Sequence, residues 1–344
     1  MPNSVITGIT GQDGAYLAQQ LLDRGHKVYG AFRRTSSVNF WRLDELDILQ
    51  HPALQLIEFD LIDSGACLRL LEKAAPDYVY NLASQSFVGA SFVEPIATAH
   101  MNAIGPLHLL EAISNFDKKI KFYQASTSEL YGQVRTAPQD EDTPFHPRSP
   151  YAVAKLFGHW ITVNYREAYG MFASSGILFN HESPLRGREF VTRKITDAVA
   201  RIYLGKQDWM EIGNLEARRD WGFAKEYTQG MILILEHSEP GIFVLATGKN
   251  ASVREFASMA FAAVGVDIGW RGQGLDEVGF CKQTGRTRIK INPTFFRPAE
   301  VDELIGNPSR AQQLLGWKAL TPLGELCRLM VEADIRRNEI GFSF

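Results

Sequence analysis

Three glycines spaced three residues apart, Gly8, Gly11 and Gly14, limit most strongly what this chain can fold into. They follow a β-branched run at residues 4–7 and precede an apolar run at residues 17–22 that predicts a helix. Glycines at such a junction permit a tight turn and let a pyrophosphate approach the helix N-terminus. We therefore expect a dinucleotide-binding unit, although the first gap is one residue wider than in the common G-x-G-x-x-G pattern.

Segments typical of strands and helices alternate through the first half of the chain. With the strand at residues 4–7, they predict strands at 27–32, 54–59, 78–82, 121–125 and 174–179, and helices near 66–74 and 103–114. Alternation of this kind with short connections predicts an α/β fold, a Rossmann-type doubly wound parallel sheet covered on both faces.

The second half of the chain changes character. Residues 183–223 are rich in arginine and broken in pattern, and residues 265–300 are rich in glycine and arginine and predict loops. A strand at 243–247 and helices near 252–264 and 322–338 remain recognisable. We expect a cofactor-binding lobe at residues 1–180 and a smaller, discontinuous C-terminal substrate lobe at 181–344. Returning segments near 222–247 and 300–310 are expected to rejoin the first lobe.

Charge and cysteine content exclude several classes of function. The formal net charge of −3 over 344 residues provides no global basic field for nucleic acid or anionic membranes. The chain carries no apolar run long enough to span a membrane, and strand-like residues at its start leave no room for a signal peptide. Three cysteines without metal-like spacing, Cys67, Cys281 and Cys327, favour a cytoplasmic protein without a metal site.

The chemistry concentrates in two neighbouring motifs. Residues 126–132, Ser-Thr-Ser-Glu-Leu-Tyr-Gly, supply a hydroxyl and the carboxylate of Glu129, and Tyr151-Ala-Val-Ala-Lys155 follows. A phenol and an ammonium four residues apart share one helix face, and the ammonium is expected to lower the pKa of the phenol. Tyr151 would then serve as a base near neutral pH, and Glu129 adds a second proton-transfer group. Taken singly, a chance Tyr-x-x-x-Lys pair or a solvated loop glutamate remains an alternative.

The end of the second expected strand bears on the choice of cofactor. NAD sites usually place an acid there to bind the ribose 2′-hydroxyl, but this strand ends in Arg33 and Arg34. Two guanidinium groups suit a 2′-phosphate, so we predict NADP, with a surface arginine pair as the alternative. The loops after the third and fourth strands are expected to contact the same cofactor. The predicted binding residues are Gly8, Thr10, Gly11, Gln12, Asp13, Gly14, Arg33, Arg34, Asp60, Leu61, Leu82, Ala83, Ser84, Gln85 and Ser86.

These motifs, in this order and spacing, resemble the extended short-chain dehydrogenase/reductase family of nucleotide-sugar enzymes, and within it the GDP-mannose 4,6-dehydratases. The resemblance covers nearly the whole chain and is carried by Tyr123–Gly132, Pro147–Lys155, Ile177–Pro184, Phe190–Lys194 and Phe296–Glu300. One departure is that Ile96-Ala97 stands where such dehydratases can carry a tyrosine near the cofactor.

The resemblance implies roles at the matched positions. Thr127, Glu129 and Tyr151 would form the catalytic set, and Lys155 would bind the nicotinamide ribose. Cofactor contacts are implied for Tyr151, Lys155, His181 and Arg186, and the GDP-sugar site is implied to contain Asn180, Lys194, Arg219, Arg297 and Glu300. From chemistry alone, His181 can equally be structural, Arg219 can pair with Asp220, and Arg297 can anchor a loop.

The resemblance also implies the reaction. The expected activity is a lyase reaction that converts GDP-mannose to GDP-4-keto-6-deoxymannose and water by internal hydride transfer through tightly bound NADP. A nucleotide-sugar 4-epimerase or 4-keto reductase has no evident need for a carboxylate at position 129. A non-catalytic nucleotide sensor is the third alternative, and the intact glycine loop, tyrosine and lysine oppose it.

We also expect a homotetramer or homodimer. The residues after the arginine pair include the aromatic side chains of Phe40 and Trp41 next to Arg42, which suit contact with a partner chain. The alternative is a flap that folds over the adenosine site of its own chain.

Overall fold

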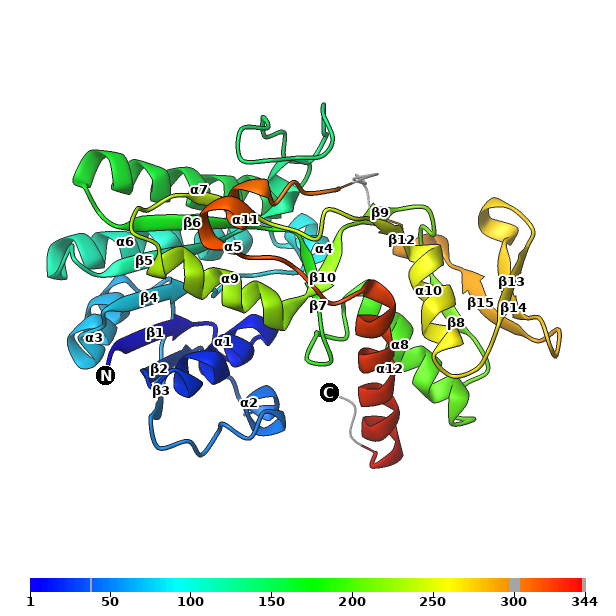
Figure 1. The fold of residues 1–344 in the computed structure, drawn as a ribbon. Helices are drawn as coiled ribbons and strands as arrows, with labels where there is room; N and C mark the ends of the chain where they lie inside the picture. Colours follow the sequence, from blue (N-terminus) through cyan, green and yellow to red (C-terminus); the bar gives the residue numbers. More distant parts are fainter. Residues whose placement is uncertain (38, 297–303, 342–344) are drawn as a thin grey trace.

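A seven-stranded parallel sheet forms the larger part of the computed structural model, which describes residues 1–37, 39–296 and 304–341 (Figure 1). The spatial order of the strands is β11-β6-β5-β4-β1-β2-β3. The order reverses between β1 and β4, which is where open α/β sheets bind nucleotides at the carboxyl ends of the strands. The strands are β1 (Asn3–Thr7), β2 (Lys27–Phe32), β3 (Leu54–Glu58), β4 (Tyr78–Asn81), β5 (Lys121–Thr127), β6 (Ala173–Leu178) and β11 (Ile242–Leu245).

Helices cover both faces of this sheet, so its strands are apolar on both sides. Within β1, Ile6 belongs to the core formed with α1 and α9, whereas its neighbour Val5 belongs to the core formed with α3 and α6. Alternate side chains of a strand point to opposite faces, and both of these residues are fully buried. The covering helices are α1 (Gln12–Asp23) and α9 (Ala224–Glu236) on one face, and α3 (Ser64–Ala74), α6 (Gly105–Phe116) and α7 (Pro150–Tyr169) on the other.

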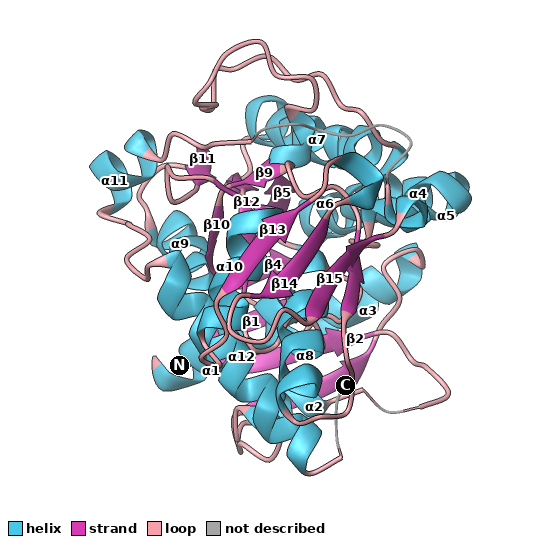
Figure 2. Ribbon diagram, turned by 90° about the vertical axis from the view of Figure 1, so that its right-hand side faces the viewer, coloured by secondary structure: helices cyan, strands magenta, loops and turns pink. Residues whose placement is uncertain are grey.

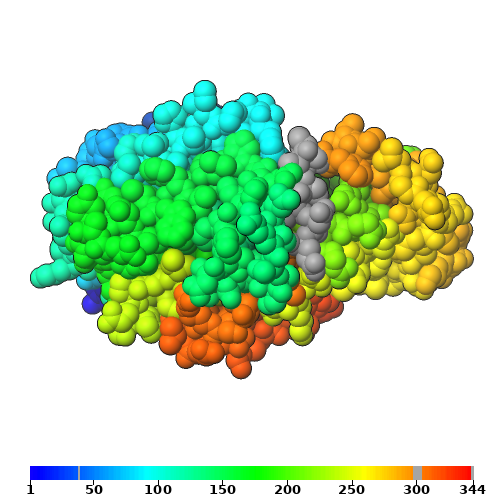
Figure 3. All heavy atoms as spheres, turned by 90° about the horizontal axis from the view of Figure 1, so that it is seen from above, coloured from blue at the N-terminus to red at the C-terminus, as the bar shows by residue number. Residues whose placement is uncertain are grey.

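The second half of the chain forms a smaller lobe with a core of its own at one end of the molecule (Figures 1 and 3), and Figure 2 views the molecule from that end. Its sheet has the order β13-β14-β15-β8, with β8 (Met210–Ile212) parallel to β15 (Thr287–Ile291). The other strands and the helices packed on this core are β13 (Ile268–Arg271), β14 (Val278–Cys281), α8 (Val191–Tyr203), α10 (Val253–Ala262) and α12 (Leu323–Glu339).

The loop prediction for residues 265–300 is therefore wrong, because the described part of this segment contains the strands β13, β14 and β15. Residues 183–223, whose pattern is broken in the sequence, contain the 13-residue helix α8. The strands are short and separated by glycine-rich turns, so their alternation is weak in the sequence. In α8, Ile195, Val199 and Ile202 repeat at helical spacing and are buried, which is a signal that the arginine content concealed.

Short elements join the two lobes. After β7 (Asn180–Glu182), the chain builds α8 and β8 and returns through β10 (Trp221–Phe223), which pairs with β7 in parallel. It then enters α9 and β11 of the large sheet. The remaining elements are α2 (Trp41–Glu45), α4 (Val88–Val93), α5 (Pro95–Ala99), a π-helical turn (His100–Ile104), β9 (Arg218–Arg219) paired with β12 (Ala251–Ser252), α11 (Ser309–Leu315), and 3₁₀ turns at Ser128–Leu130, Gly274–Asp276 and Pro293–Phe295.

The architecture confirms the predicted fold class, a Rossmann-type doubly wound parallel sheet with a smaller second lobe. Among the residues that the structure describes, no helix combines the length and apolar character needed to cross a membrane.

Candidate active site

The glycine loop lies against the end of β4, with almost no space between the two backbones. Gly8 has φ +73°, and a Cβ atom there would come within 2.9 Å of the Ala83 nitrogen. A Cβ on Gly14 would lie 2.4 Å from the Gly8 oxygen. Thr7 joins the two strands, because its hydroxyl donates to Asn81 Oδ1 at 2.7 Å and accepts from the Ala83 N–H at 3.1 Å. Only glycine permits this close approach, which leaves a bare peptide surface before the N-terminus of α1.

A cavity of about 570 Å³ opens next to this surface. Predicted cofactor residues from three separate segments line it, namely Thr10, Gly11, Gln12, Ser86 and Arg186. The rest of its lining comes from the segments 39–42 and 187–190, which are not among the predicted cofactor residues. The fold therefore brings the glycine loop, the β4 loop and the loop after β7 together around one space.

His181 lies on β7 and contacts the glycine loop through Asp13. Its Nε2 lies 2.9 Å from Asp13 Oδ2, and its Nδ1 lies 2.7 Å from the carbonyl oxygen of Phe179. Both ring nitrogens face acceptors, an arrangement that favours the doubly protonated imidazolium form. Burial by itself would lower the pKa of His181, but the Asp13 carboxylate outweighs it and the pKa is raised. Burial would likewise raise the pKa of Asp13, yet His181 lowers it.

The same histidine stacks on Tyr227 of α9, with ring centroids 4.8 Å apart. Gln12 adds a further tie, because its amide donates to the His181 carbonyl at 3.1 Å and accepts from the Ser183 hydroxyl at 2.6 Å. His181 thus fixes the loop after β7 to the start of α1, which fits the structural role that the sequence left open.

The predicted catalytic residues come from β5 and α7. Thr127 ends β5, and its hydroxyl accepts the N–H of Glu129 at 3.3 Å, which caps the turn that carries the carboxylate. Ser149 caps α7 by accepting from the Ala152 N–H at 3.1 Å, so Tyr151 lies in the first helical turn. Thr127 lowers and Glu129 raises the pKa of the Tyr151 phenol, so the fold brings hydroxyl, carboxylate and phenol together.

Lys155 does not have the effect on Tyr151 that the sequence predicts. Its ammonium donates to the carbonyl of Ala125 at 3.0 Å and lies 6.0 Å from the centroid of the Tyr151 ring. Burial raises the pKa of Tyr151 to about 12. Thr127 acts to lower this pKa, and the charge of Glu129 acts to raise it. Burial also lowers the pKa of Lys155 to about 8. The prediction that the pKa of Tyr151 is lowered is therefore wrong, because burial has a larger effect on this pKa than the neighbouring charges have.

A second cavity, of about 740 Å³, lies towards the smaller lobe and is lined by Lys194. The Lys194 ammonium lies 5.0 Å from the centroid of the Phe295 ring. Arg188 and Glu189 line both cavities, so the loop before α8 separates the two spaces. Nearby on β7, Asn180 Oδ1 is buried and has no hydrogen-bond partner among the described atoms, which suits a ligand that donates a hydrogen bond.

The remaining substrate-site predictions are only partly described. Arg219 is buried on β9 and donates to the Arg218 carbonyl at 2.9 Å. Its neighbour Asp220 accepts hydrogen bonds from the backbone of Thr247, Gly248 and Gly306. Two further predicted residues, Arg297 and Glu300, lie outside the described residues.

The two arginines predicted to select NADP are exposed at the end of β2. Arg34 Nη1 lies 3.8 Å from Glu58 Oε2, with side-chain exposures of 81% and 60%, so this ion pair is weak. In the loop after β3, Asp60 accepts from the Ile62 N–H at 3.2 Å and Leu61 is buried.

In the loop after β4, Leu82 and Ala83 adjoin the glycine loop, and Ser84 and Gln85 follow them. The sequence analysis missed Asn102 of the π-helical turn, which fixes Gln85 by two hydrogen bonds of 2.8 Å. Asn102 is one isolated residue in a helical pattern, so no local signal marks it.

The aromatic residues expected to meet a partner chain pack within their own chain. Phe40 contacts Phe32 edge to face, with centroids 4.9 Å apart. The Trp41 ring lies 4.4 Å from the Arg42 guanidinium and 5.2 Å from that of Arg337. This segment borders the 570 Å³ cavity, as the alternative of a flap predicted, and the expected assembly stays a prediction.

Comparison with known proteins identifies the family. A family model described as GDP-mannose 4,6 dehydratase matches residues 5–330. GDP-mannose 4,6 dehydratase 2 of Caenorhabditis elegans is 52% identical over 339 residues, which is 96% of this chain and 88% of that protein. GDP-mannose 4,6-dehydratase of Sinorhizobium fredii is 50% identical over 337 residues, 96% of each chain. The human GDP-mannose 4,6 dehydratase is 48% identical over 340 residues, 96% of this chain and 91% of that protein.

Solved structures agree on the fold. A dTDP-glucose 4,6-dehydratase from Bacillus anthracis superposes with a TM-score of 0.82 at 18% identity, covering 99% of both chains. A UDP-glucose 4-epimerase from Thermotoga maritima gives a TM-score of 0.81 at 24% identity, covering 98% of this chain and 99% of that one. The resemblance found in the motifs is thus confirmed along the whole chain, which belongs to the GDP-mannose 4,6-dehydratase family.

Proposed function

We propose that this protein converts GDP-mannose to GDP-4-keto-6-deoxymannose and water. The carrying observation is that Thr127 and Glu129 both act on the Tyr151 phenol, and that the Thr127 hydroxyl also caps the turn that holds Glu129. Family membership supports the same assignment. A phenol alone serves oxidation or epimerisation at C4, whereas loss of water also needs a group that takes the proton from C5.

The residues present fit a nicotinamide dinucleotide. A Cβ atom on Gly8 or Gly14 of the glycine loop would collide with the neighbouring backbone, so the loop presents bare peptide groups. Such groups suit a pyrophosphate at the start of α1. We assign Gly8, Gly11 and Gly14 to that contact, and Lys155 to the ribose next to the nicotinamide. The chemistry that the dinucleotide supplies when bound is acceptance and return of one hydride, together with a positive ring that favours a phenolate. Arg33 and Arg34 support NADP as the form that binds.

Tyr151 would act first, by taking the proton from O4 of the sugar as C4 is oxidised. Its position in the first turn of α7 places the phenol next to Thr127, and burial excludes water from it. Because its pKa is about 12 in the chain alone, Tyr151 becomes an effective base only when a positive charge lies near it.

Glu129 would then remove the proton from C5, which the new ketone at C4 has made acidic. The same carboxyl group, or the Thr127 hydroxyl, would protonate the leaving O6, so that water departs. C6 would take back the hydride, and C5 would regain a proton from Tyr151, which holds the one taken from O4. Because Glu129 and Thr127 sit at the end of β5, one rigid strand end positions the proton donor and the proton acceptor.

The nucleotide part of the substrate would occupy the 740 Å³ cavity. Lys194 lines it, and among the described residues its ammonium contacts an aromatic ring rather than a carboxylate. Asn180 offers a buried oxygen without a partner, and Arg219 adds a positive charge from β9. These groups suit a nucleoside diphosphate. Arg297 and Glu300 complete the proposed set, from the family resemblance alone.

We also propose a homodimer or homotetramer in the cytoplasm. Val153, Phe157 and Trp160 are 57%, 42% and 52% exposed, and their spacing places them on one face of α7. Three buried free thiols fit a reducing compartment. Light scattering at micromolar concentration should give a dimer or tetramer, and a monomeric mass would refute the assembly.

The function is tested by incubating the protein with GDP-mannose and a catalytic amount of NADP, followed by mass spectrometry. We expect a product lighter by one water. Product with unchanged mass would favour an epimerase, accumulation of NADPH in proportion to product would favour a reductase acting in reverse, and no product would favour a nucleotide sensor.

Two variants separate the steps. Glu129→Gln should fold, bind both ligands and stop after oxidation, which gives the absorbance of reduced nicotinamide without loss of water. Tyr151→Phe should give neither signal. Release of the dehydrated product by Glu129→Gln at the wild-type rate would contradict the role of this residue.

A further inference from the structure

Arg42 of α2 lies in a position that the proposed reaction has not used. Its Nη1 donates to the Thr10 carbonyl of the glycine loop at 2.9 Å, and its Nε donates to the Leu185 carbonyl at 2.7 Å. The guanidinium also stacks on Trp41, 4.4 Å from the ring centroid. These contacts hold it at the rim of the 570 Å³ cavity, beside Gly11.

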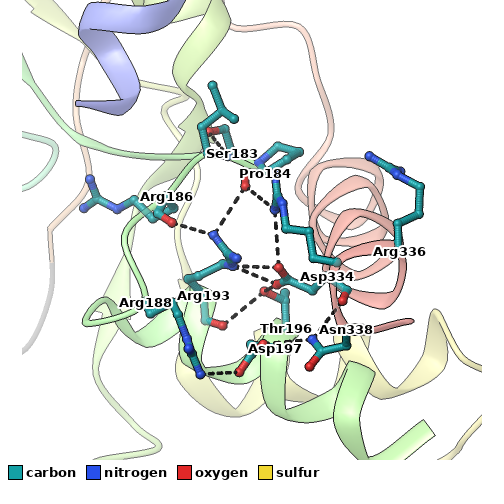
Figure 4. A network of polar contacts seen from close by, with 12 residues as sticks. Ser183, Pro184, Arg186, Arg188, Arg193, Thr196, Asp197, Asp334, Arg336 and Asn338 are labelled. Atoms are coloured by element: carbon teal, nitrogen blue, oxygen red, sulfur yellow. Dashed lines mark hydrogen bonds and ion pairs between the residues drawn. The ribbon is translucent and has the colours of Figure 1, made fainter. Parts of the chain in front are cut away.

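The loop that Arg42 binds is held by other arginines as well (Figure 4). Arg193 Nη1 donates to the Arg186 carbonyl at 2.7 Å, and Arg337 Nη1 donates to the Pro184 carbonyl at 2.7 Å. With Arg42 on Leu185, three consecutive carbonyl groups each accept from a different guanidinium. Arg42 is thus attached on both sides to rigid backbone, which orients its guanidinium group.

The charges around Arg42 favour an anion. Three positive charges, those of Arg186, Arg193 and Arg337, act on the Arg42 guanidinium, and the negative charge of Glu189 acts against them. Burial lowers the pKa of Arg42 to about 10, so the group still carries its charge at neutral pH. Among the described residues it forms no ion pair, and its two hydrogen bonds leave Nη2 available.

We propose that Arg42 binds the pyrophosphate of the dinucleotide and positions it over the glycine loop. Since the helix N-terminus beside Gly11 already favours this anion, a fixed guanidinium next to it adds a second point of contact. This inference rests on the proposed function, because it assigns a further residue to the same cofactor site.

This role differs from that of the arginine pair at the end of β2. Arg33 and Arg34 would contact the 2′-phosphate, which NADP has and NAD lacks. The pyrophosphate is common to both dinucleotides, so Arg42 should contribute equally to both. The two predictions therefore have opposite signatures in the same binding assay.

The test is isothermal titration of the full-length protein with NADP, NAD and adenosine 2′-monophosphate, which has no pyrophosphate. Arg42→Gln should weaken NADP and NAD by the same factor, roughly 10- to 100-fold, and leave adenosine 2′-monophosphate unchanged. Arg42→Lys, which keeps the charge but not the planar fork, should lose less. Arg24→Gln, which breaks an exposed ion pair between the residue after α1 and Glu236 of α9, is the matched control and should change none of the three.

A purely structural role for Arg42 predicts a different pattern. If the residue only ties the loops together, Arg42→Gln and Arg42→Lys should weaken all three ligands alike, and the salt dependence of NAD binding should not change. Three results would overturn the inference about Arg42 but not the proposed function. They are that pattern, an unchanged affinity for both dinucleotides, and a loss confined to NADP. If the wild-type protein bound no dinucleotide, the proposed function would fall and the inference with it.

Discussion

Lys155 offers a test of the electrostatics of the site in which stability, rather than activity, is measured. The side chain is buried, and burial lowers its pKa to about 8 from the usual 10.5. Between these two values the unfolded chain binds more protons than the folded one, so the free energy of unfolding rises with pH. The full difference corresponds to about 3 kcal/mol, and about 2 kcal/mol of it falls between about pH 7.5 and about pH 10.

The experiment is urea denaturation of the wild type and of Lys155→Met at these two pH values. The variant lacks the titrating group, so the stability of the wild type relative to it should increase by about 2 kcal/mol at the higher pH. The hydrogen bond to the Ala125 carbonyl does not confuse the comparison, because a neutral amine can still donate it. Lys119→Met, which removes one exposed positive charge, controls for general effects of charge at high pH.

If Lys155→Met and Lys119→Met shift equally with pH, burial does not penalise the charged form of Lys155 and the reasoning is refuted. The expected result has a functional meaning. A lysine whose charged form is penalised by burial is stabilised by an anionic phenolate beside it, so Tyr151 and Lys155 should titrate together when cofactor and substrate are bound.

Two further substitutions test the charged groups elsewhere. Arg33→Ala with Arg34→Ala should weaken NADP by about tenfold or more and leave NAD nearly unchanged in calorimetric titration, since each charged hydrogen bond contributes about 1.5–3 kcal/mol and exposure reduces this; equal losses would place the selectivity elsewhere. Asp334→Ala should cost about 3–5 kcal/mol in urea denaturation, because it leaves the fully buried Arg193 without its carboxylate. Glu332→Ala, which breaks an exposed pair on the same helix, should cost less than about 1 kcal/mol, and similar losses for the two would contradict this account.

The parallel sheet could be predicted because its signals are local. Strands of the first half are apolar on both faces and are separated by helices of ordinary length, so their order and type follow from periodicity. The strands of the smaller lobe could not, because residues 268–291 are short segments between glycine-rich turns. Their pairing depends on α8, α10 and α12, which cover them in space and are distant in sequence.

Within the site, the order of the residues was enough to identify the reactive groups and to locate the glycine loop. A hydroxyl at 127, a carboxylate at 129 and the Tyr151–Lys155 spacing are properties of neighbouring residues, and α7 and β5 preserve them. The surroundings of each group come from segments that are distant in the sequence, so they are known from the folded structure alone. The Ala125 carbonyl accepts a hydrogen bond from the Lys155 ammonium, Asp13 is hydrogen-bonded to His181, and burial raises the pKa of Tyr151. A pKa depends on the whole environment of a group and not on its neighbours in the chain.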